Sequence, residues 1–304
     1  MDRKHTELMV TIRCLAYNHE PYIRQCLDGF VMQKTNFRFE AIVHDDASTD
    51  GTADIIREYA EKYPDIIKPI FETENQYSKR DGSIRRIMNE HTHGKYVAMC
   101  EGDDYWIDPL KLQKQVDILN SDEQIGLCYT KAKKFNQTSG KFDTDLCGLE
   151  YKGFSQMLRE NPVVTLTTMY RRNLYDKYIK DVNPYTKFWK MGDYPLWLWI
   201  AAHYKVKYLS DVTGVYRVLL NSASHSASRE KHLQFILSSY EIKVYFAREY
   251  LPKCSKEIVN KKYYYESLLL AYKNYYIKSL KLFFRVKNKS LFDCARFIKH
   301  LICK

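Results

Sequence analysis

Two stretches of the chain decide its fold. Residues 94–106 read GKYVAMCEGDDYW, and residues 41–52 read AIVHDDASTDGT. In each stretch, an apolar run with strand-forming residues stops at a group of acidic residues. Each pattern predicts a buried strand that presents carboxylates at its carboxyl end.

Outward from these stretches, strand and helix patterns alternate through the first hundred residues. We expect strands at residues 8–15, 37–43, 66–71 and 96–100, and helices at residues 20–33, 53–63 and 83–90. Such alternation indicates βαβ units and a mostly parallel central sheet flanked by helices. In sheets of this kind, ligands bind outside the carboxyl ends of the strands. The acidic groups are therefore expected at a binding edge.

Two clusters of carboxylates at one edge repel each other unless a cation lies between them. A hard divalent ion such as Mg²⁺ or Mn²⁺ takes oxygen ligands and bridges to a diphosphate. The alternative is helix capping, because Asp50 or Thr52 could cap the helix that follows. Capping accounts for only one of the two clusters, so the sequence favours a metal and phosphate site.

The order of motifs resembles the inverting family-two glycosyltransferases. The resemblance rests on Leu15-Ala16-Tyr17-Asn18, on residues 45–52, and on Gly94-Lys95-Tyr96 leading into Glu101-Gly102-Asp103-Asp104, and it covers roughly residues 7–220. It implies the GT-A fold, which is Rossmann-like, and transfer of a sugar from a nucleotide-diphosphate sugar with a divalent metal, Mg²⁺ or Mn²⁺. UDP is the default nucleotide, from this resemblance alone.

The resemblance also implies roles for single residues of the donor site. Tyr17 and Asn18 would line the nucleotide pocket, with the tyrosine against the base, and Asp45 or Asp46 would bind the base edge. Arg85 would contact the nucleotide. Residues 101–104 match the metal-binding D-x-D motif with Glu101 in place of its first aspartate, so Asp103 and Asp104 are expected to bind the ribose and the metal.

The resemblance places the catalytic base at Asp193, in the segment Met191-Gly192-Asp193-Tyr194-Pro195-Leu196-Trp197. Inverting transfer needs a carboxylate that takes the proton of the acceptor hydroxyl. Asp193 could equally cap a helix that begins near Pro195. The two roles are compatible, because the helix dipole favours the ionised carboxylate.

The segment 214–219 resembles the one that follows the base, where many members read Tyr-Arg-x-His. Leu219 stands in the position of that histidine. Arg217 could reach the diphosphate, or it could form an ordinary surface salt bridge. A further hypothesis places His225 in a mobile loop that closes over the donor.

The rest of the chain is expected to complete one catalytic domain and to add a helical extension. We expect a polar loop at residues 130–151 and a strand pair at residues 206–209 and 214–219, with helices at residues 232–251, 256–285 and 290–302. The expected domains are a GT-A domain at residues 1–225, divided into a nucleotide-binding half (about 1–110) and an acceptor-binding half (about 111–225), and a C-terminal helical region at residues 226–304.

Composition limits the setting in which such a protein works. Lysine and arginine exceed acidic residues by 48 to 37, a net charge of +11, which suits an anionic partner. The eight cysteines form no C-x-x-C pair, so reduced thiols are expected. Residues 1–7 lack the apolar core of a secretory signal, and no apolar stretch reaches the ~20 residues of a membrane span. These features predict a cytoplasmic protein.

The last seventy residues interleave lysines and arginines with aromatic residues. Helices of this composition can lie on an anionic membrane surface, at the inner face of the plasma membrane, where a lipid-linked acceptor would be found. The alternative is a helical bundle that packs on the catalytic domain or on another subunit. The expected partners are thus a nucleotide sugar, a glycan or lipid-linked acceptor, and an anionic membrane as a peripheral contact.

Three other functions compete with transfer to a surface glycan. A sugar-phosphate nucleotidyltransferase would need a Gly-rich basic loop after the first strand, where this chain reads Tyr17-Asn18-His19-Glu20-Pro21. A nucleic-acid-binding module would need a recognition motif, and none is present, so we expect no nucleic-acid partner. A degenerate binding protein that has the fold without turnover stays open.

Overall fold

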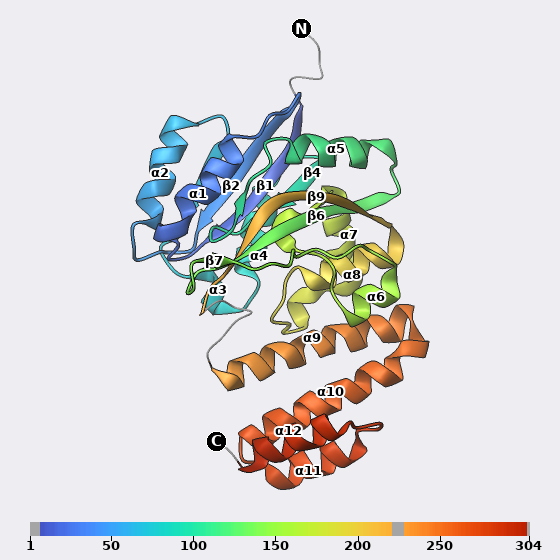
Figure 1. The fold of residues 1–304 in the computed structure, drawn as a ribbon. Helices are drawn as coiled ribbons and strands as arrows, with labels where there is room; N and C mark the ends of the chain where they lie inside the picture. Colours follow the sequence, from blue (N-terminus) through green and yellow to red (C-terminus); the bar gives the residue numbers. More distant parts are fainter. Residues whose placement is uncertain (1–6, 221–227, 303–304) are drawn as a thin grey trace. The chain divides into compact units, whose positions relative to one another are not determined.

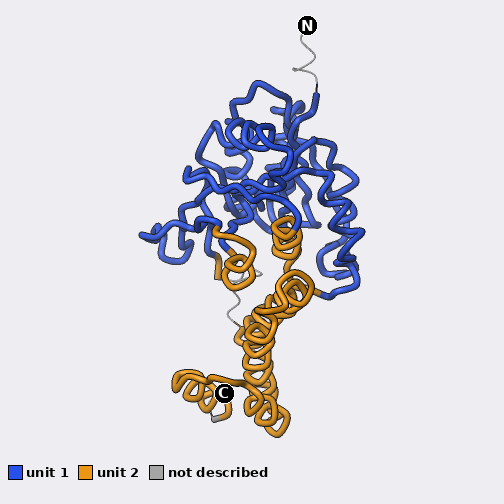
Figure 2. Tube along the Cα trace, turned by 90° about the vertical axis from the view of Figure 1, so that its right-hand side faces the viewer, with its two compact units in different colours: residues 1–151, 162–188, 203–218 blue, residues 152–161, 189–202, 219–304 orange. Residues whose placement is uncertain are grey.

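The computed structural model describes residues 7–220 and 228–302, and His225 therefore lies outside the described residues. The chain divides into two compact units, coloured blue and orange in Figure 2. The first consists of residues 1–151, 162–188 and 203–218, and the second of residues 152–161, 189–202 and 219–304.

The first unit is built on one large sheet, shown in Figure 1. Its strands are β1 (Leu8–Ala16), β2 (Arg38–Asp45), β3 (Ile67–Phe71), β4 (Tyr96–Met99), β5 (Tyr105–Trp106), β6 (Ile125–Asn136), β7 (Lys141–Phe142), β8 (Met169–Arg171) and β9 (Lys205–Val218). Among the described residues these form a nine-stranded sheet in the order β3-β2-β1-β4-β8-β6-β9-β5, with β7 on β6.

The first four of these strands confirm the α/β prediction. Strands β1, β2, β3 and β4 pair in parallel, with Ala16 opposite Asp45 at the carboxyl ends of β1 and β2. The second half of the sheet is mixed, because β8 joins β4 and β6 in the antiparallel sense, as β5 joins β9. The parallel half therefore brings the ends of β1, β2 and β4 to one edge.

Helices cover this sheet and complete its core. The first unit contains α1 (Glu20–Val31), α2 (Thr52–Lys62), α3 (Gln76–Lys79), α4 (Ser83–Glu90), α5 (Lys111–Ser121) and α7 (Arg172–Val182). Helix α1 buries Ile23, Leu27 and Phe30 in the same core as Val10 and Ile12 of β1. The 3.6-residue spacing of these apolar side chains is the reason that the sequence predicted the helix.

Two predictions for the middle of the chain are wrong. Residues 130–136 of the expected polar loop belong to strand β6, which ends at Asn136. The two strands expected at residues 206–209 and 214–219 are one continuous strand, β9. Strands β6 and β9 pair in parallel along their length, with register shifts near Lys131. The pairing satisfies the backbone hydrogen bonds of both strands, which outweighs the polarity of β6.

The second unit is helical. It contains α6 (Phe154–Arg159), most of α8 (Tyr194–His203), α9 (Arg229–Tyr250), α10 (Pro252–Tyr272), α11 (Tyr276–Arg285) and α12 (Leu291–Ile302). The helices expected at residues 232–251 and 290–302 are confirmed, whereas the one expected at residues 256–285 is broken. Asn274 adopts the left-handed conformation, φ 65°, which ends α10 and lets α11 start in a new direction.

Leu233, Tyr264, Leu268, Phe283 and Phe297 form the apolar core of the helices α9 to α12. Within the described ranges, none of the helices combines the length and the apolar character that crossing a bilayer requires.

Candidate active site

The candidate donor site lies where β1, β2 and β4 end. The Asp46 N–H donates to the Ala16 carbonyl (2.9 Å), and the Gly102 N–H donates to the Leu15 carbonyl (2.9 Å). These two bonds tie the segments after β2 and β4 to the end of β1. The three motifs, which lie up to about 85 residues apart in the chain, are therefore neighbours because parallel strands end at the same edge.

Tyr17 and Asn18 begin the loop that follows β1. Asn18 is left-handed (φ 54°), which an asparagine tolerates, and its side-chain oxygen accepts the Thr49 N–H at 2.8 Å. Its own N–H donates to the Ser48 hydroxyl at 2.9 Å. Asn18 thus holds the loop after β2, while the Tyr17 side chain is 46% exposed and can contact a ligand.

The neighbouring residues Asp45 and Asp46 are both buried but have different surroundings. Both carboxylate oxygens of Asp46 accept backbone N–H groups, from Gln76 at 2.6 Å and from Tyr77 at 3.0 Å. Asp45 accepts the Ser48 N–H through Oδ2 at 3.2 Å, whereas its buried Oδ1 has no hydrogen-bond partner in the described part of the chain. A buried acceptor without a partner is costly, and a ligand N–H would satisfy it.

The acidic turn after β4 contains Asp103 and Asp104. Asp104 is buried, and its Oδ1 accepts the Arg217 N–H at 2.7 Å. Burial raises the pKa of Asp104 well above its usual range, and the charge of Asp103 adds to this effect. Two adjacent carboxylates in such surroundings gain from a bound cation. Glu101 is exposed and its carbonyl closes the turn by accepting the Asp104 N–H at 3.0 Å.

No group of three or more His, Cys, Asp or Glu side chains is arranged to hold a metal ion alone within residues 7–220 and 228–302. A magnesium-type ion commonly takes one or two carboxylates and completes its shell with substrate phosphates and water. Asp103 and Asp104 fit that mode, because no hydrogen bond reaches the Asp103 carboxylate or Asp104 Oδ2 among the described residues. The residues therefore fit a metal that is shared with a diphosphate.

The Arg217 guanidinium is hydrogen-bonded to the acidic turn and to two side chains. It is buried (7% exposed), and its Nε donates to the Asp103 carbonyl at 2.7 Å. Its two terminal nitrogens donate to the side-chain oxygens of Gln137 and Gln25, each at 2.7 Å. Arg217 therefore positions the acidic turn from behind, and it forms no surface salt bridge in the described part of the chain.

His19 is a site residue that the sequence analysis missed. Burial lowers the pKa of His19, although the carboxylates of Asp103, Asp50 and Asp45 act in the opposite direction. Its Nδ1 is buried without a partner among the described residues. A Cβ added to Gly102 would lie 2.8 Å from this atom, so glycine permits the close approach. No sequence signal distinguishes this histidine from a solvated one.

Arg85 and Asp193 complete the predicted set. Arg85 lies in the first turn of α4, and its guanidinium makes no hydrogen bond or ion pair within the described ranges, unlike Arg86, which binds Asp81. Asp193 belongs to the second unit and precedes α8. Its carbonyl accepts the Trp197 N–H at 3.1 Å, which makes it the residue just before the first turn of the helix, and its Oδ1 accepts the Tyr194 N–H at 2.7 Å.

Comparison with known proteins identifies the family of the chain. The family model described as "Glycosyl transferase family 2" matches residues 14–179, which is more than half of the chain. The chain belongs to glycosyl transferase family 2. This membership favours the glycosyltransferase over the nucleotidyltransferase interpretation, and the GT-A fold agrees with it.

One relative of this chain is Rv1520 of Mycobacterium tuberculosis, which is 34% identical over 226 residues. The alignment covers 73% of this chain and 62% of that protein, so the chain matches less than two thirds of its relative.

Two solved structures share the fold. S. aureus TarS 1–349 in complex with UDP-GlcNAc has a TM-score of 0.59 at 17% identity, covering 97% of this chain and 89% of that one. The mannosyltransferase PcManGT from Pyrobaculum calidifontis, in complex with GDP-Man and Mn²⁺, has a TM-score of 0.58 at 20% identity, covering 96% and 79%.

Proposed function

We propose that this glycosyltransferase moves a sugar from a nucleotide-diphosphate sugar to a hydroxyl of a glycan or lipid-linked acceptor, with inversion, in the synthesis of a cell-surface polysaccharide. The observation that carries the proposal is the edge where β1, β2 and β4 end. There the unpartnered oxygen of Asp45 lies in the same loop cluster as the adjacent carboxylates of Asp103 and Asp104.

In this proposal the nucleotide binds across the ends of β1 and β2. Asp45 Oδ1 accepts an N–H of the base, and this bond satisfies the buried oxygen. Tyr17 stacks on the base, and Asn18 keeps the loop after β2 in place. Asp46 stabilises the start of α3 through its two backbone hydrogen bonds, which leaves Asp45 as the base-binding member of the pair.

Asp103 and Asp104 would hold a divalent metal together with the donor, and Glu101 lies beside them in the same turn. When bound, the metal would neutralise negative charge on the leaving diphosphate. Arg217 holds the turn that carries both carboxylates, and Arg85 supplies a positive charge without a protein partner in the described ranges. UDP is the proposed nucleotide carrier, and the structures with UDP-GlcNAc and with GDP-Man support a nucleotide-sugar donor in general.

Asp193 is the proposed general base. It would accept the proton of the acceptor hydroxyl while oxygen attacks the anomeric carbon and the nucleoside diphosphate leaves from the opposite face. Its backbone position at the start of α8 limits the movement of the carboxylate. Asp193→Asn should abolish sugar transfer and leave nucleotide affinity unchanged. If transfer rate and nucleotide affinity fall by the same factor, Asp193 is not the base. NMR of the product anomer tests inversion.

Calorimetric titration tests the donor site directly. UDP, GDP and dTDP are titrated with and without Mn²⁺ into the wild type and into Asp103→Asn/Asp104→Asn. We expect one nucleotide to bind with Mn²⁺ and to lose that binding in the variant. Arg85→Gln should weaken binding and Arg86→Gln, whose native partner is Asp81, should not. A folded wild type that binds none of the nucleotides would contradict the proposal.

The proposal also covers the acceptor and the place in the cell where transfer occurs. A lipid-linked acceptor would be presented at the inner face of the plasma membrane. The basic helices α9 to α12 would then make a peripheral contact with anionic lipid, while the nucleotide site works from the cytoplasm.

A further inference from the structure

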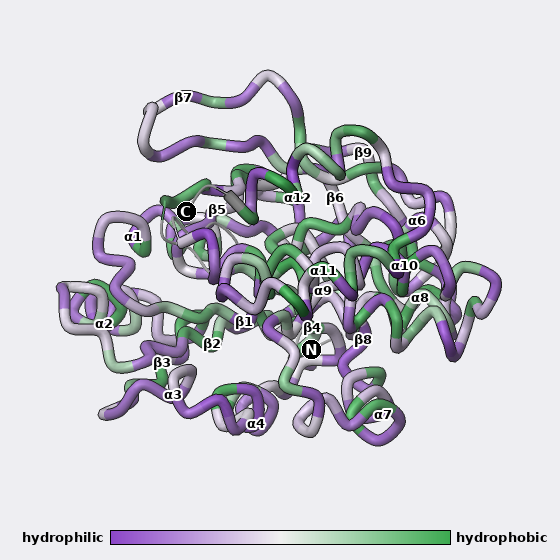
Figure 3. The backbone as a smooth tube through the Cα atoms, turned by 90° about the horizontal axis from the view of Figure 1, so that it is seen from below, coloured by the Kyte–Doolittle hydropathy of each residue, from purple (hydrophilic) through white to green (hydrophobic). Residues whose placement is uncertain are grey.

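The helices α11 and α12 each bury one face and expose apolar side chains on the other. On the buried face, the rings of Phe283 and Phe297 stack with centroids 3.8 Å apart. The exposed apolar side chains are Tyr276, Ile277, Leu280 and Phe284 on α11 and Leu291, Phe292 and Ile298 on α12. Hydrophobic and hydrophilic residues alternate along these helices in Figure 3. We call these exposed side chains the apolar stripe, and exposed large apolar side chains in this number on two short helices are typical of an interaction surface.

The charge around the apolar stripe indicates what covers it. Residues 267–302 contain eight lysines and arginines and a single acidic residue, Asp293. Asp293 is already bonded to the N–H and hydroxyl of Ser290. A second copy of this chain would bring like charges together, whereas an anionic bilayer would attract them. Apolar helices flanked by lysine and arginine are typical of segments that lie in a membrane interface.

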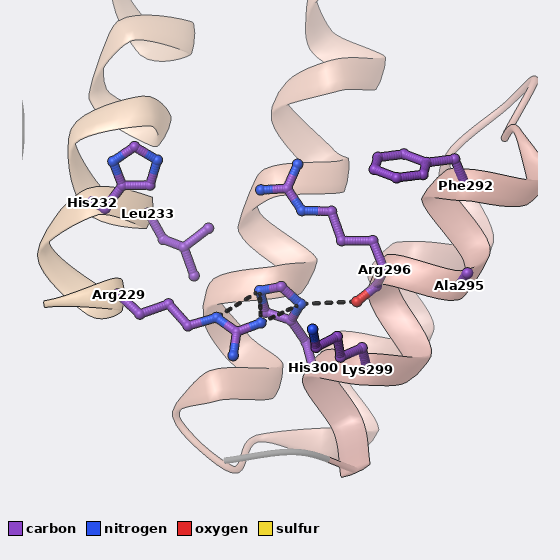
Figure 4. A pocket seen from close by; sticks show the side chains of 8 residues that line it. All are labelled: Arg229, His232, Leu233, Phe292, Ala295, Arg296, Lys299 and His300. Carbon is purple, nitrogen blue, oxygen red and sulfur yellow. Dashed lines mark hydrogen bonds between the residues drawn. The ribbon is translucent and has the colours of Figure 1, made fainter. Parts of the chain in front are cut away.

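A cavity of about 500 Å³ lies between the first turn of α9 and α12, as Figure 4 shows. Its lining residues are Arg229, His232, Leu233, Phe292, Ala295, Arg296, Lys299 and His300. Three of these are cations and none is a carboxylate. Within the described ranges, Arg229, Arg296 and Lys299 form no ion pair, so the cavity has uncompensated positive charge.

The arrangement of Arg229 and His300 keeps this charge available. His300 Nδ1 donates to the Arg296 carbonyl at 2.8 Å, so Nε2 is the acceptor and receives the Arg229 guanidinium at 2.9 Å (Figure 4). Burial lowers the pKa of His300, and the nearby positive charges act in the same direction. A neutral imidazole thus orients Arg229 without cancelling its charge, which suits an anionic ligand.

We propose that this cavity binds the headgroup phosphate of an anionic phospholipid while the apolar stripe enters the interface of the bilayer. Phe292 belongs to both features, because it lines the cavity and is 72% exposed, so one lipid could satisfy both. The inference rests on the peripheral membrane contact proposed above and names the lipid class and the residues that recognise it.

Flotation of the full chain with vesicles tests the inference. One set of vesicles is phosphatidylcholine, and the other contains about one third phosphatidylglycerol, which gives a negative surface. We expect binding to the second set only. Arg296→Gln/Lys299→Gln should partition roughly 30-fold more weakly. Each cation near an anionic surface contributes about 1 kcal/mol to binding, and about 2 kcal/mol corresponds to this factor. Neither side chain makes a hydrogen bond or ion pair in the described part of the chain, so the variant should fold.

The matched control is Lys253→Gln/Lys256→Gln, which removes the same charge from exposed positions at the start of α10. It should reduce binding by less than about threefold if those lysines lie beyond the screening distance of the membrane. Equal losses in both variants would overturn the phosphate site and leave only general electrostatic attraction. Phe284→Ser/Leu291→Ser tests the apolar stripe and should also abolish flotation.

Two further outcomes would overturn the inference. If millimolar inorganic phosphate binds the cavity and vesicles do not, the site takes a free anion and not a lipid. If Phe284→Ser/Leu291→Ser converts a dimer into a monomer during sedimentation, the apolar stripe pairs with a second copy. Nucleotide titration on the same preparation separates these results from a failure of the proposed transfer, because flotation needs no donor.

Discussion

Replacing Arg217 by lysine tests whether this residue holds the acidic turn. Arg217 donates from three nitrogens, to the Asp103 carbonyl and to the side chains of Gln137 and Gln25. Lysine retains the charge but has a single nitrogen, which can reach only one of these acceptors. Hydrogen bonds from a charged donor contribute about 1.5–3 kcal/mol each. These bonds are only partly buried and Gln25 and Gln137 are exposed, so losing two should lower the free energy of unfolding by about 3 kcal/mol, the lower end of that range.

The assay is urea unfolding at neutral pH, followed by calorimetric titration of the nucleotide with Mn²⁺. Arg24→Lys is the control, because Arg24 also uses two guanidinium nitrogens, at 2.8 and 2.7 Å from Glu58, but is half exposed. Solvent screens that pair, so this substitution should cost far less stability. Nucleotide affinity should fall only in Arg217→Lys. If both variants lose the same stability, or if affinity is unchanged, Arg217 does not position the turn.

Three shorter predictions concern buried groups. Burial lowers the pKa of Lys111 to about 8, so its charged form costs stability below that pH and the cost disappears as pH rises toward 10.5. The advantage of Lys111→Met over the wild type in free energy of unfolding should therefore shrink by roughly 2–3 kcal/mol between pH 7 and 10, and a constant difference would contradict this. Gly102→Ala places a methyl group 2.8 Å from His19 Nδ1 and should cost about 1–3 kcal/mol, measured by thermal unfolding, with weaker nucleotide binding. Asp46→Asn loses an acceptor for a backbone N–H and should lower the free energy of unfolding by about 1–3 kcal/mol, measured with urea. Asp45→Asn should mainly weaken nucleotide binding. If Asp45→Asn instead loses stability and Asp46→Asn loses nucleotide affinity, the roles given to the two residues are wrong.

Local patterns predicted much of the first hundred residues. The helix at residues 83–90 agrees with α4, and the strands expected at residues 8–15 and 66–71 agree with β1 and β3 to within one residue. Burial on one face gives these elements a regular apolar period that is visible in the sequence. The acidic groups were also predicted at strand ends, because a change from apolar to charged residues ends a buried strand.

The errors occur where pairing between distant segments decides the structure. Strand β6 contains Lys131, Lys133 and Lys134 and has no clean apolar alternation, yet it pairs with β9 about 80 residues later. The break after Tyr272 depends on the left-handed Asn274. Asparagine favours such positions, but a single asparagine within a long run of helix-forming residues is a weak signal.

The sequence by itself determined the family, the βαβ alternation and the identity of the residues at the strand ends, because these follow from short-range patterns and from motif order. Only the tertiary structure decided how those residues differ. It separated Asp46, whose oxygens bind backbone N–H groups, from Asp45, which has a buried oxygen without a partner in the described ranges. It also turned Arg217 inward and brought His19 against Gly102. The physical reason is that hydrogen bonding and burial depend on contacts between segments far apart in the chain, which residue type and spacing do not encode.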